Sequence, residues 1–352
     1  MNQPIKVGLF AYGMSGKVFH MPLLDHHAGF QVSKVLERRR VTASDDYSYL
    51  QVVKTADELL ADPEIELIIV NTPEATHATL CRQALEAGKH VVSEKAFTVT
   101  SQEAQELITL AEEKNLILSV FQNRRWDSDF LTVKKVMEDG LLGRIVSYES
   151  HFDRYRTFIK PSTWKEDDAP GTGILYNLGS HLIDQALVLF GEPEEVFADL
   201  RVVRTNGRVP DYFTLILFYP TFTATLKASY LVRGRHPKYQ VLGEMGSFKK
   251  FGMDTQEDAL KAGTPYGSTG WGEEEENNWG ELDANVNGLD MTAKIQSIPG
   301  NYLAFYDNIF QAIRENKPLE VQAKTALKTI QIIESSYESW RTGRKIQLNK
   351  LR

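Results

Sequence analysis

The chain has 352 residues, a length that favours two domains at about 150 residues per domain. Its 40 Lys and Arg residues and 47 Asp and Glu residues give a net charge of −7, which leaves no basic excess for binding nucleic-acid phosphates. The single cysteine, Cys81, excludes an internal disulfide and fits a reducing compartment. No long apolar core follows the N-terminus, and every apolar run is shorter than the ~18 residues of a spanning helix, so we expect a soluble, cytoplasmic protein.

Strand-like and helix-like segments alternate through the first third of the chain. Strands are expected at 5–10, 30–36, 64–70, 90–93 and 116–121, and helices at 18–24, 76–87 and 101–114. Gly88 stands where a helix C-cap belongs, and Thr100 or Ser101 where an N-cap belongs. This alternation predicts a parallel, doubly wound α/β sheet, and we end the first domain at residue 122.

Residues 123–352 follow a different rhythm and are expected to form a second α/β domain. Helices are expected at 130–138, 180–190, 302–315 and 324–340, and strands at 144–152, 195–203, 212–219, 223–232 and 239–242. Four successive strands without intervening helices predict an open, mostly antiparallel sheet with one covered face. The segment 257–299 is expected to be a loop, and we interpret its four consecutive glutamates, 273–276, as a solvated face rather than a metal site.

A turn of small residues follows the first strand and precedes the first helix. Its members are Ala11, Tyr12, Gly13, Met14, Ser15 and Gly16. Between a strand and a helix, this pattern predicts a dinucleotide-binding turn, because backbone N–H groups and the helix N-terminus face the pyrophosphate. Gly13 allows close approach of the backbone and Gly16 allows close packing of helix on strand. Ala11 replaces the first glycine of G-x-G-x-x-G and holds the turn only if its φ is negative.

Two opposing signals for cofactor choice follow the second strand. Glu37, at the strand end, is the kind of residue that binds the adenosine ribose hydroxyls and favours NAD. Arg38, Arg39 and Arg40 come directly after it, and their guanidinium groups suit the 2′-phosphate of NADP. A solvated basic loop is the alternative interpretation of the three arginines. The sequence therefore predicts NAD or NADP and leaves the choice open.

Five motifs, in order along essentially the whole chain, resemble those of the Gfo/Idh/MocA family of oxidoreductases. They are YGMSGKVFH at 12–20, NTP at 71–73 with His77, AGKHVVSEK at 87–95, NRRWD at 123–127 and GSHLID at 179–184. The NRRWD run and the FHMPLL stretch are most similar to the family's NADP-using scyllo-inositol dehydrogenase branch. The resemblance implies a Rossmann domain followed by an α/β domain whose open sheet often forms a subunit interface, hence a homodimer or homotetramer.

The resemblance assigns chemistry to two residues that lie far apart in the sequence. Lys95, just past a strand end, is implied to position the substrate and the nicotinamide, with Glu94 near the cofactor. His181, at the start of a helix, matches the family's catalytic histidine, and an imidazole accepts a hydroxyl proton near neutral pH. Asp184 shares a helix face with His181 and either orients the imidazole or serves the first turn of the helix.

Two positions depart from the family pattern. Position 177 is usually Asp and here is Asn177, which hydrogen-bonds a hydroxyl but supplies no negative charge to an imidazolium. Position 96 is usually Pro and here is Ala96, which lacks the fixed φ that stiffens the Lys95 loop. Both changes leave Lys95 and His181 in place. They nevertheless support an alternative interpretation, in which the protein binds NAD(P) but is only weakly catalytic.

Further site residues are expected in segments that flank the cleft in this family. Asn71, Thr72, Pro73 and His77 are expected to meet the cofactor. Guanidinium and carboxylate groups suit polyol hydroxyls, and aromatic faces suit C–H edges, which gives the substrate candidates Arg124, Trp126, Asp153, Arg154, Tyr155, Arg156, Trp164 and Tyr176. Ordinary packing is the alternative for Trp126 and Tyr155. No His, Cys, Asp and Glu residues have zinc-like spacing, so we expect catalysis without a metal.

Together these features predict an NAD(P)-dependent oxidoreductase that transfers a hydride between nicotinamide C4 and a carbinol or keto carbon of a cyclic polyol or sugar. In this hypothesis His181 takes the hydroxyl proton, Lys95 steadies the oxygen, and Asn177 and Asp184 orient the pair. An inositol is the first substrate expected and a sugar or keto-sugar the second. The alternatives are a weakly catalytic sensor or partner-binding protein and a regulator on DNA, which the charge of −7 disfavours. We expect no membrane partner.

Overall fold

The computed structural model describes residues 3–39, 41–159 and 166–348, and the chain divides into two compact units. Unit 1 comprises Met1–Asn123, Gln256–Trp271 and Asn301–Leu327. Unit 2 comprises Arg124–Thr255, Gly272–Gly300 and Lys328–Arg352. The segment expected as one second domain, 123–352, therefore contributes residues to both units.

Parallel strands form the sheet of unit 1, in the order β3-β2-β1-β4-β5-β6. Their bounds are β1 Ile5–Leu9, β2 Phe30–Leu36, β3 Gln51–Val53, β4 Leu67–Val70, β5 His90–Ser93 and β6 Leu118–Val120. Every residue of β4 is buried, as expected for a strand covered on both faces. The predicted doubly wound parallel sheet is confirmed, and the strand order reverses beside β1, where open α/β sheets bind ligands.

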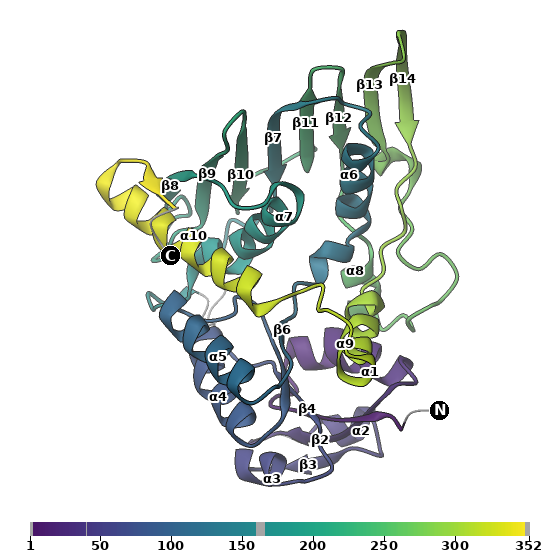
Figure 1. Cartoon of the computed structure of the whole chain (residues 1–352), viewed down its shortest axis with the longest axis vertical. Helices are drawn as coiled ribbons and strands as arrows, with labels where there is room; N and C mark the ends of the chain where they lie inside the picture. Colours follow the sequence, from purple (N-terminus) through teal and green to yellow (C-terminus); the bar gives the residue numbers. More distant parts are fainter. Residues whose placement is uncertain (1–2, 40, 160–165, 349–352) are drawn as a thin grey trace. The chain divides into compact units, whose positions relative to one another are not determined.

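Helices cover both faces of this sheet, with α4 and α5 on one face and α1 and α9 on the other (Figure 1). The bounds are η1 Gly16–His20, α1 Met21–His26, α2 Ala43–Asp46, α3 Ala56–Leu60, η2 Glu74–Thr76, α4 His77–Glu86, α5 Ser101–Glu113, α8 Gln256–Lys261 and α9 Leu303–Glu315. A capping box of Thr100 and Glu103 begins α5, and Gly88, with a φ of +75°, follows the end of α4. Both expected caps are confirmed.

The sheet of unit 2 has the strand order β14-β13-β12-β11-β7-β10-β9-β8-β15. The bounds are β7 Ile145–His151, β8 Glu195–Arg201, β9 Tyr212–Phe218, β10 Thr223–Ser229, β11 Tyr239–Gly243, β12 Gly246–Lys250, β13 Gly280–Val286, β14 Leu289–Ile295 and β15 Ile346–Gln347. Among these described strands β7 and β10 pair in parallel and the other pairs are antiparallel, which confirms the mostly antiparallel sheet.

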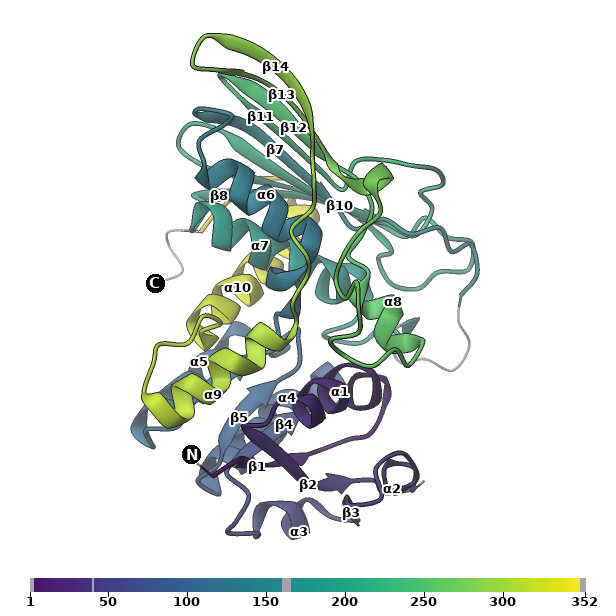
Figure 2. The same cartoon turned by 90° about the vertical axis from the view of Figure 1, so that its right-hand side faces the viewer.

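One face of the unit 2 sheet is covered by helices, and buried and half-exposed side chains alternate along β8, β9 and β10 accordingly. The helices of unit 2 are α6 Ser128–Glu138, η5 Leu175–Gly179, α7 Ser180–Phe190 and η6 Glu276–Asn278. Two further helices, η3 Asn123–Trp126 and α10 Ala323–Thr342, begin in residues of unit 1 and continue into unit 2. Figure 2 shows α6 and α7 against one face of the sheet. In the described ranges no helix has both the length and the apolar character to cross a membrane.

The segment 257–299, expected to be a loop, contains α8, β13 and β14. The interpretation of its glutamate run as wholly solvated is wrong at one position. The side chain of Glu274 is fully buried and lies 2.6 Å from the ammonium of Lys250, which is equally buried. The hydroxyls of Ser128 and Ser297 also donate to Glu274, at 2.6 Å each. A buried carboxylate needs such partners, and the three neighbouring glutamates remain exposed.

Candidate active site

The turn between β1 and η1 has the backbone geometry of a dinucleotide site. A Cβ at Gly16 would lie 2.6 Å from the carbonyl oxygen of Ala11 and 2.7 Å from Nδ2 of Asn71, so this packing requires glycine. A Cβ at Gly13 would meet no protein atom within 4 Å, so the turn opens onto free space there. Ala11 has no positive φ, which meets the condition set by the sequence. The turn therefore fits the close approach of a phosphate to Gly13.

Asn71, at the carboxyl end of β4, braces this turn from the neighbouring strand. Its Oδ1 accepts the backbone N–H of Ala11 at 3.0 Å, and its Nδ2 donates to the carbonyl oxygen of Ala11 at 2.7 Å. The amide thus holds both polar groups of the residue that replaces the first motif glycine. The side chain of Asn71 therefore shapes the turn by binding the backbone of Ala11.

Other residues expected at the cofactor surround the turn. The hydroxyl of Tyr12 donates to Asp46 at 2.8 Å, and the ammonium of Lys17 lies 2.7 Å from the same carboxylate. Hydrogen bonds from Lys17 and Tyr12 lower the pKa of Asp46, whereas burial and the bond to Asp46 raise the pKa of Tyr12 above 10. Met14 is exposed and Ser15 half-buried at the start of the helix. Tyr12 therefore remains a neutral donor.

Glu37 is turned into its own loop. Its carboxylate accepts the N–H groups of Thr42 and Ala43 at 2.9 Å each, and the hydroxyl of Thr42 at 2.8 Å. These bonds satisfy N–H groups at the beginning of α2, and Glu37 is only 9% exposed. Arg38 and Arg39, by contrast, are exposed. The acidic residue supports the loop, and the described arginines face solvent.

The Lys95 loop follows β5 and is held by a histidine. The N–H of Lys95 donates to Oε2 of Glu94 at 3.1 Å. The carbonyl oxygens of Ala96 and Thr72 lie 2.9 Å and 2.8 Å from Nδ1 and Nε2 of His77, which is fully buried. Ala96 is buried as well, and the Lys95–Ala96 peptide bond is cis. His77 thus links two loops by hydrogen bonds to their backbone carbonyl groups. One of these carbonyl groups belongs to Ala96, the position at which the family pattern has a proline.

The remaining cofactor candidates, Thr72 and Pro73, lie where β4 leads into η2. The hydroxyl of Thr72 is 2.7 Å from that of Thr76, which also donates to the carbonyl oxygen of Pro73 at 2.7 Å. Pro73 is exposed and Thr72 half-buried. Both remain available at the edge of the sheet that carries the dinucleotide turn.

In unit 2, His181 lies in the first turn of α7 and is 5% exposed. Its ring stacks on Phe152, with centroids 6.2 Å apart and an interplanar angle of 26°. Three cations lie near the same phenyl ring, with Arg124, Arg154 and Lys238 at 5.0, 5.5 and 5.6 Å from its centroid. The candidate proton acceptor therefore shares its aromatic partner with donors that suit hydroxyl oxygens.

The residues expected to orient His181 have partners of their own. Asp184 accepts two hydrogen bonds from Arg125, at 2.8 Å from Nε and 2.6 Å from Nη2. Asn177, in the π-helical segment η5 before α7, donates through Nδ2 to the hydroxyl of Tyr230 at 3.3 Å. The charge of Asp184 is therefore balanced by Arg125, and Asn177 is fixed on an aromatic hydroxyl.

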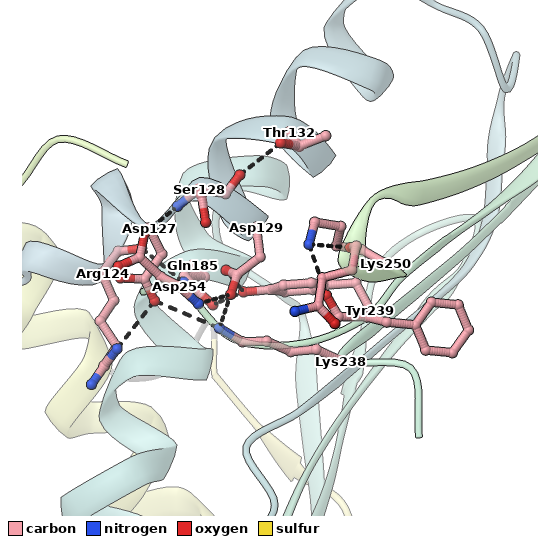
Figure 3. A network of polar contacts seen from close by, with 12 residues as sticks. Arg124, Asp127, Ser128, Asp129, Thr132, Gln185, Lys238, Tyr239, Lys250 and Asp254 are labelled. Carbon is pink, nitrogen blue, oxygen red and sulfur yellow. Dashed lines mark hydrogen bonds and ion pairs between the residues drawn. The ribbon is translucent and has the colours of Figure 1, made fainter. Parts of the chain in front are cut away.

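Buried carboxylates fix two of the cations beside Phe152 (Figure 3). The ammonium of Lys238 lies 2.6 Å from Asp129 and 3.5 Å from Asp127, and Arg124 lies 3.2 Å from Asp127. Both carboxylates are fully buried. Burial raises the pKa of Asp127 to about 7, although Arg124 and Lys238 act to lower it. Burial therefore favours the neutral form of Asp127, and the two cations favour its carboxylate.

The structure places Asp153 on the other face of the sheet. Its Oδ1 accepts the N–H of Ser229 at 3.0 Å, and its Oδ2 lies 2.8 Å from Nδ1 of His151. Side chains alternate along this segment, and Phe152 points to the face covered by α7. Asp153 and His151 therefore belong to the open face, apart from His181.

The remaining substrate candidates are scattered. Tyr155 is 56% exposed and bridges to Leu231, while Trp126 and Tyr176 are buried. The guanidinium of Arg156 lies 5.6 Å from the ring centroid of Tyr230. Trp164 lies outside the described residues. Within the described ranges no group of three or more His, Cys, Asp or Glu side chains could hold a metal ion.

Comparison with protein families matches both halves of the chain. Residues 5–122 match the model of the Gfo/Idh/MocA oxidoreductase family described as its NAD-binding Rossmann fold. Residues 134–348 match the model described as the C-terminal alpha/beta domain of the same family.

Similarity to individual proteins extends over nearly the whole chain. The scyllo-inositol 2-dehydrogenase (NADP(+)) IolW of Bacillus subtilis is 42% identical over 98% of this chain and 96% of its own length. The crystal structure of the Bacillus subtilis protein yvaA is 41% identical, with a TM-score of 0.95 over 98% of both chains. An oxidoreductase from Bacillus cereus is 33% identical, with a TM-score of 0.91 over 97% of this chain and 98% of its own.

Proposed function

We propose that this chain, which belongs to the Gfo/Idh/MocA family of NAD(P)-dependent oxidoreductases, transfers a hydride between nicotinamide C4 and a carbinol or keto carbon of a cyclic polyol. An inositol is the first substrate proposed, since a relative that is 42% identical carries the name scyllo-inositol 2-dehydrogenase. A sugar or keto-sugar is the second. The proposal depends most on the open space at Gly13 within a turn that otherwise packs tightly.

The residues of unit 1 fit a nicotinamide dinucleotide. Gly13 leaves room for the pyrophosphate, and Gly16 brings η1 against β1. Thr72 and Pro73 border the same edge of the sheet, and Glu94 and Lys95 directly follow the neighbouring strand, β5. The bound cofactor would supply the hydride acceptor or donor. The chain's own task is to bind it, orient it and handle the substrate proton.

The loop after β2 supports NADP over NAD. A carboxylate that binds ribose hydroxyls needs its oxygens directed at the ligand. The oxygens of Glu37 instead accept three hydrogen bonds from Thr42 and Ala43. Arg38 and Arg39 are exposed and free to turn toward a 2′-phosphate, a bidentate partner of guanidinium. Arg40 lies outside the described residues.

In the proposed reaction His181 accepts the proton of the substrate hydroxyl during oxidation and returns it during reduction. Lys95 donates a hydrogen bond to the same oxygen, which stabilises the negative charge that develops there. In this proposal Asn177 helps to orient His181, and its own amide donates a hydrogen bond to the hydroxyl of Tyr230. Asp184, paired with Arg125, fixes α7. Arg124 and Arg154, beside Phe152, are the proposed donors to the other hydroxyls of a polyol.

The open face of the unit 2 sheet supports a homodimer or homotetramer. Residues on that face of β8, β9 and β11 include Phe197, Ile216, Phe218 and Leu242, which are half-buried in the single chain. A second copy of the chain would cover them. A single buried cysteine keeps the cytoplasm as the proposed location.

Stopped-flow measurements on a panel of inositols and hexoses test the proposal. We expect NADPH formation from NADP+ with at least one inositol, and a loss of about 10²-fold or more in the hydride-transfer rate on His181→Gln. Lys95→Met should lower the same rate while the affinity for NADPH changes less. Binding of NADPH without turnover across the whole panel would favour the alternative, a catalytically weak sensor of the same fold.

A further inference from the structure

A chain of buried polar side chains in unit 1 links helix α9 to the Lys95 loop. The hydroxyl of Tyr306, in α9, lies 2.6 Å from Nδ1 of His20, at the end of η1. Nε2 of His20 lies 3.1 Å from Oε1 of Glu94. The other carboxylate oxygen, Oε2, accepts the N–H of Lys95 at 3.1 Å. Three elements far apart in the sequence are thus joined by a chain of hydrogen bonds that leads to the carboxylate of Glu94.

This chain occupies the interior of the unit. His20 and Tyr306 are both 0% exposed. The ring of Phe121 lies 4.5 Å from that of His20 and 5.9 Å from that of Tyr306, so aromatic contacts fix both rings. Leu or Phe would fill such space without a polar atom to satisfy. Polar groups kept in a core at this cost are expected to hold something in a defined place.

The charges set the direction of the hydrogen bonds. Burial acts to raise the pKa of Glu94, but the hydrogen bond and charge of His20, together with Lys95, outweigh it and lower the pKa to about 2. The carboxylate is therefore ionised and can only accept, so Nε2 of His20 must carry the hydrogen between them. Burial raises the pKa of Tyr306 well above 10, which keeps its hydroxyl protonated.

We propose that His20 and Tyr306 are positioning residues for the nicotinamide end of the cofactor site. They hold the carboxylate of Glu94, which in turn holds the backbone of Lys95. The inference rests on the proposed function, since it needs Lys95 and Glu94 to lie at the nicotinamide. It assigns a role to α9, a helix from the C-terminal third of the sequence, in shaping a site on the first strands.

The position of His20 sharpens the inference. It lies on the same helical segment that begins at Gly16 of the dinucleotide turn. One rigid path therefore joins the part of the site expected to hold the pyrophosphate to the part expected to hold the nicotinamide. Replacing His20 should disturb the nicotinamide part of the site and spare the pyrophosphate part. The turn around Gly16 keeps its own packing, and Asn71 still holds Ala11.

Two ligands separate these parts in a binding experiment on the full chain. NADPH occupies both, whereas 2′-phospho-ADP-ribose lacks the nicotinamide. We expect His20→Gln to weaken NADPH about tenfold, the loss of one charge-assisted hydrogen bond, and to change the affinity for the fragment less than about twofold. Tyr306→Phe removes one oxygen from a ring that stays in place, and should act in the same direction with a smaller effect.

His27→Gln is the matched control. His27 lies 3.1 Å from Asp307, so it also joins the first helix to α9 through a histidine–carboxylate pair, but it does not contact Glu94. This variant should bind both ligands like the wild type. In a double-mutant cycle, His20→Gln and Glu94→Gln should be strongly non-additive, because both break the same link.

The outcomes separate the two proposals. Equal losses of NADPH and fragment affinity in His20→Gln, or no loss of either, would overturn the positioning role while the proposed function stands. Additive effects with Glu94→Gln would do the same. A wild-type protein that binds neither ligand would overturn the proposed function itself.

Discussion

The carboxylate of Asp184 is held by the guanidinium of Arg125 through two hydrogen bonds, at 2.6 Å and 2.8 Å. The side chains are 2% and 11% exposed, so water screens this pair little. A bidentate arrangement uses both carboxylate oxygens and balances their charge. Asp184 is therefore first an ion-pair partner that ties α7 to η3, three residues along the helix from His181.

Removing the guanidinium of Arg125 should destabilise the folded chain, because the buried carboxylate of Asp184 then has no cation beside it. Arg125→Ala leaves Asp184 without its cation, and we expect the free energy of unfolding to fall by about 3 kcal/mol in urea titrations. Adding Asp184→Asn to that variant should recover part of the loss, since no unpaired charge then remains buried. Additive losses in the double variant would contradict the pairing as the cause.

The two motif glycines should respond differently to alanine. Gly13→Ala meets no protein atom, so its melting temperature should stay within about 2 °C of the wild type, while its new methyl group lowers NADPH affinity by about tenfold or more. Gly16→Ala drives a Cβ against Ala11 and Asn71 and should lower stability by about 2 kcal/mol. Thermal melts and fluorescence titrations measure both. An unaltered NADPH affinity in a folded Gly13→Ala protein would place the phosphate elsewhere.

Cofactor choice should reside in the arginines after β2. Arg39→Ala should weaken NADPH about tenfold, the loss of one charge-assisted contact, and leave NADH unchanged. Glu37→Gln places an amide donor against N–H groups and should loosen the loop, which weakens both cofactors together. Titration of each variant with both cofactors distinguishes these effects. A change confined to NADH in Glu37→Gln would restore its role as the ribose ligand.

Asp127 should make stability depend on pH. Its pKa is raised to about 7 in the folded chain, so between about pH 4 and pH 7 the folded state binds more protons than the unfolded one. The free energy of unfolding therefore falls as pH rises through this window, and the full penalty is present above pH 7. The charged groups that surround Asp127 are Arg124, Lys238, Asp129 and Asp254.

Asp127→Asn removes the titration. Denaturation at pH 5 and pH 8 should show that the variant gains stability relative to the wild type with rising pH, by about 3 kcal/mol, at about 1.4 kcal/mol per pKa unit. The difference between the two curves reports the titration of Asp127 together with its effect on the neighbouring carboxylates Asp129 and Asp254. Parallel curves would mean that this carboxylate stays ionised throughout.

Features governed by neighbours in sequence were predictable. Gly88 and Thr100 act as caps within one turn of the helices that they bound, and the parallel strands of unit 1 appear as short apolar runs. The hairpin β13–β14 was missed, although apolar and polar residues alternate along both of its strands, GELDANV and LDMTAKI. This alternation is a strand signal, but the expectation of a loop followed the abundance of glycine, glutamate and asparagine in the segment 257–299.

Site features that depend on distant residues were not predictable. Glu274 belongs to a charged run, and its contacts with Lys250 and two serine hydroxyls make its burial tolerable. Phe152 and Lys238 belong to no motif, and their contact with His181 and Asp129 arises from the sheet. Glu37 was located correctly at the strand end, but its hydrogen bonds to Thr42 and Ala43 depend on the path of the loop.

The joining of Asn301–Leu327 to the N-terminal unit has a consequence for protein engineering. A fragment cut after residue 122 would expose the phenyl ring of Phe121, which in the full chain lies 4.9 Å from that of Phe305. It would also leave His20 without its hydrogen-bond partner, the hydroxyl of Tyr306. Such a fragment should aggregate rather than serve as a portable nucleotide carrier. Anyone grafting this half onto another catalyst must transplant three separate stretches of polypeptide, and shuffling at a single crossover point cannot deliver them.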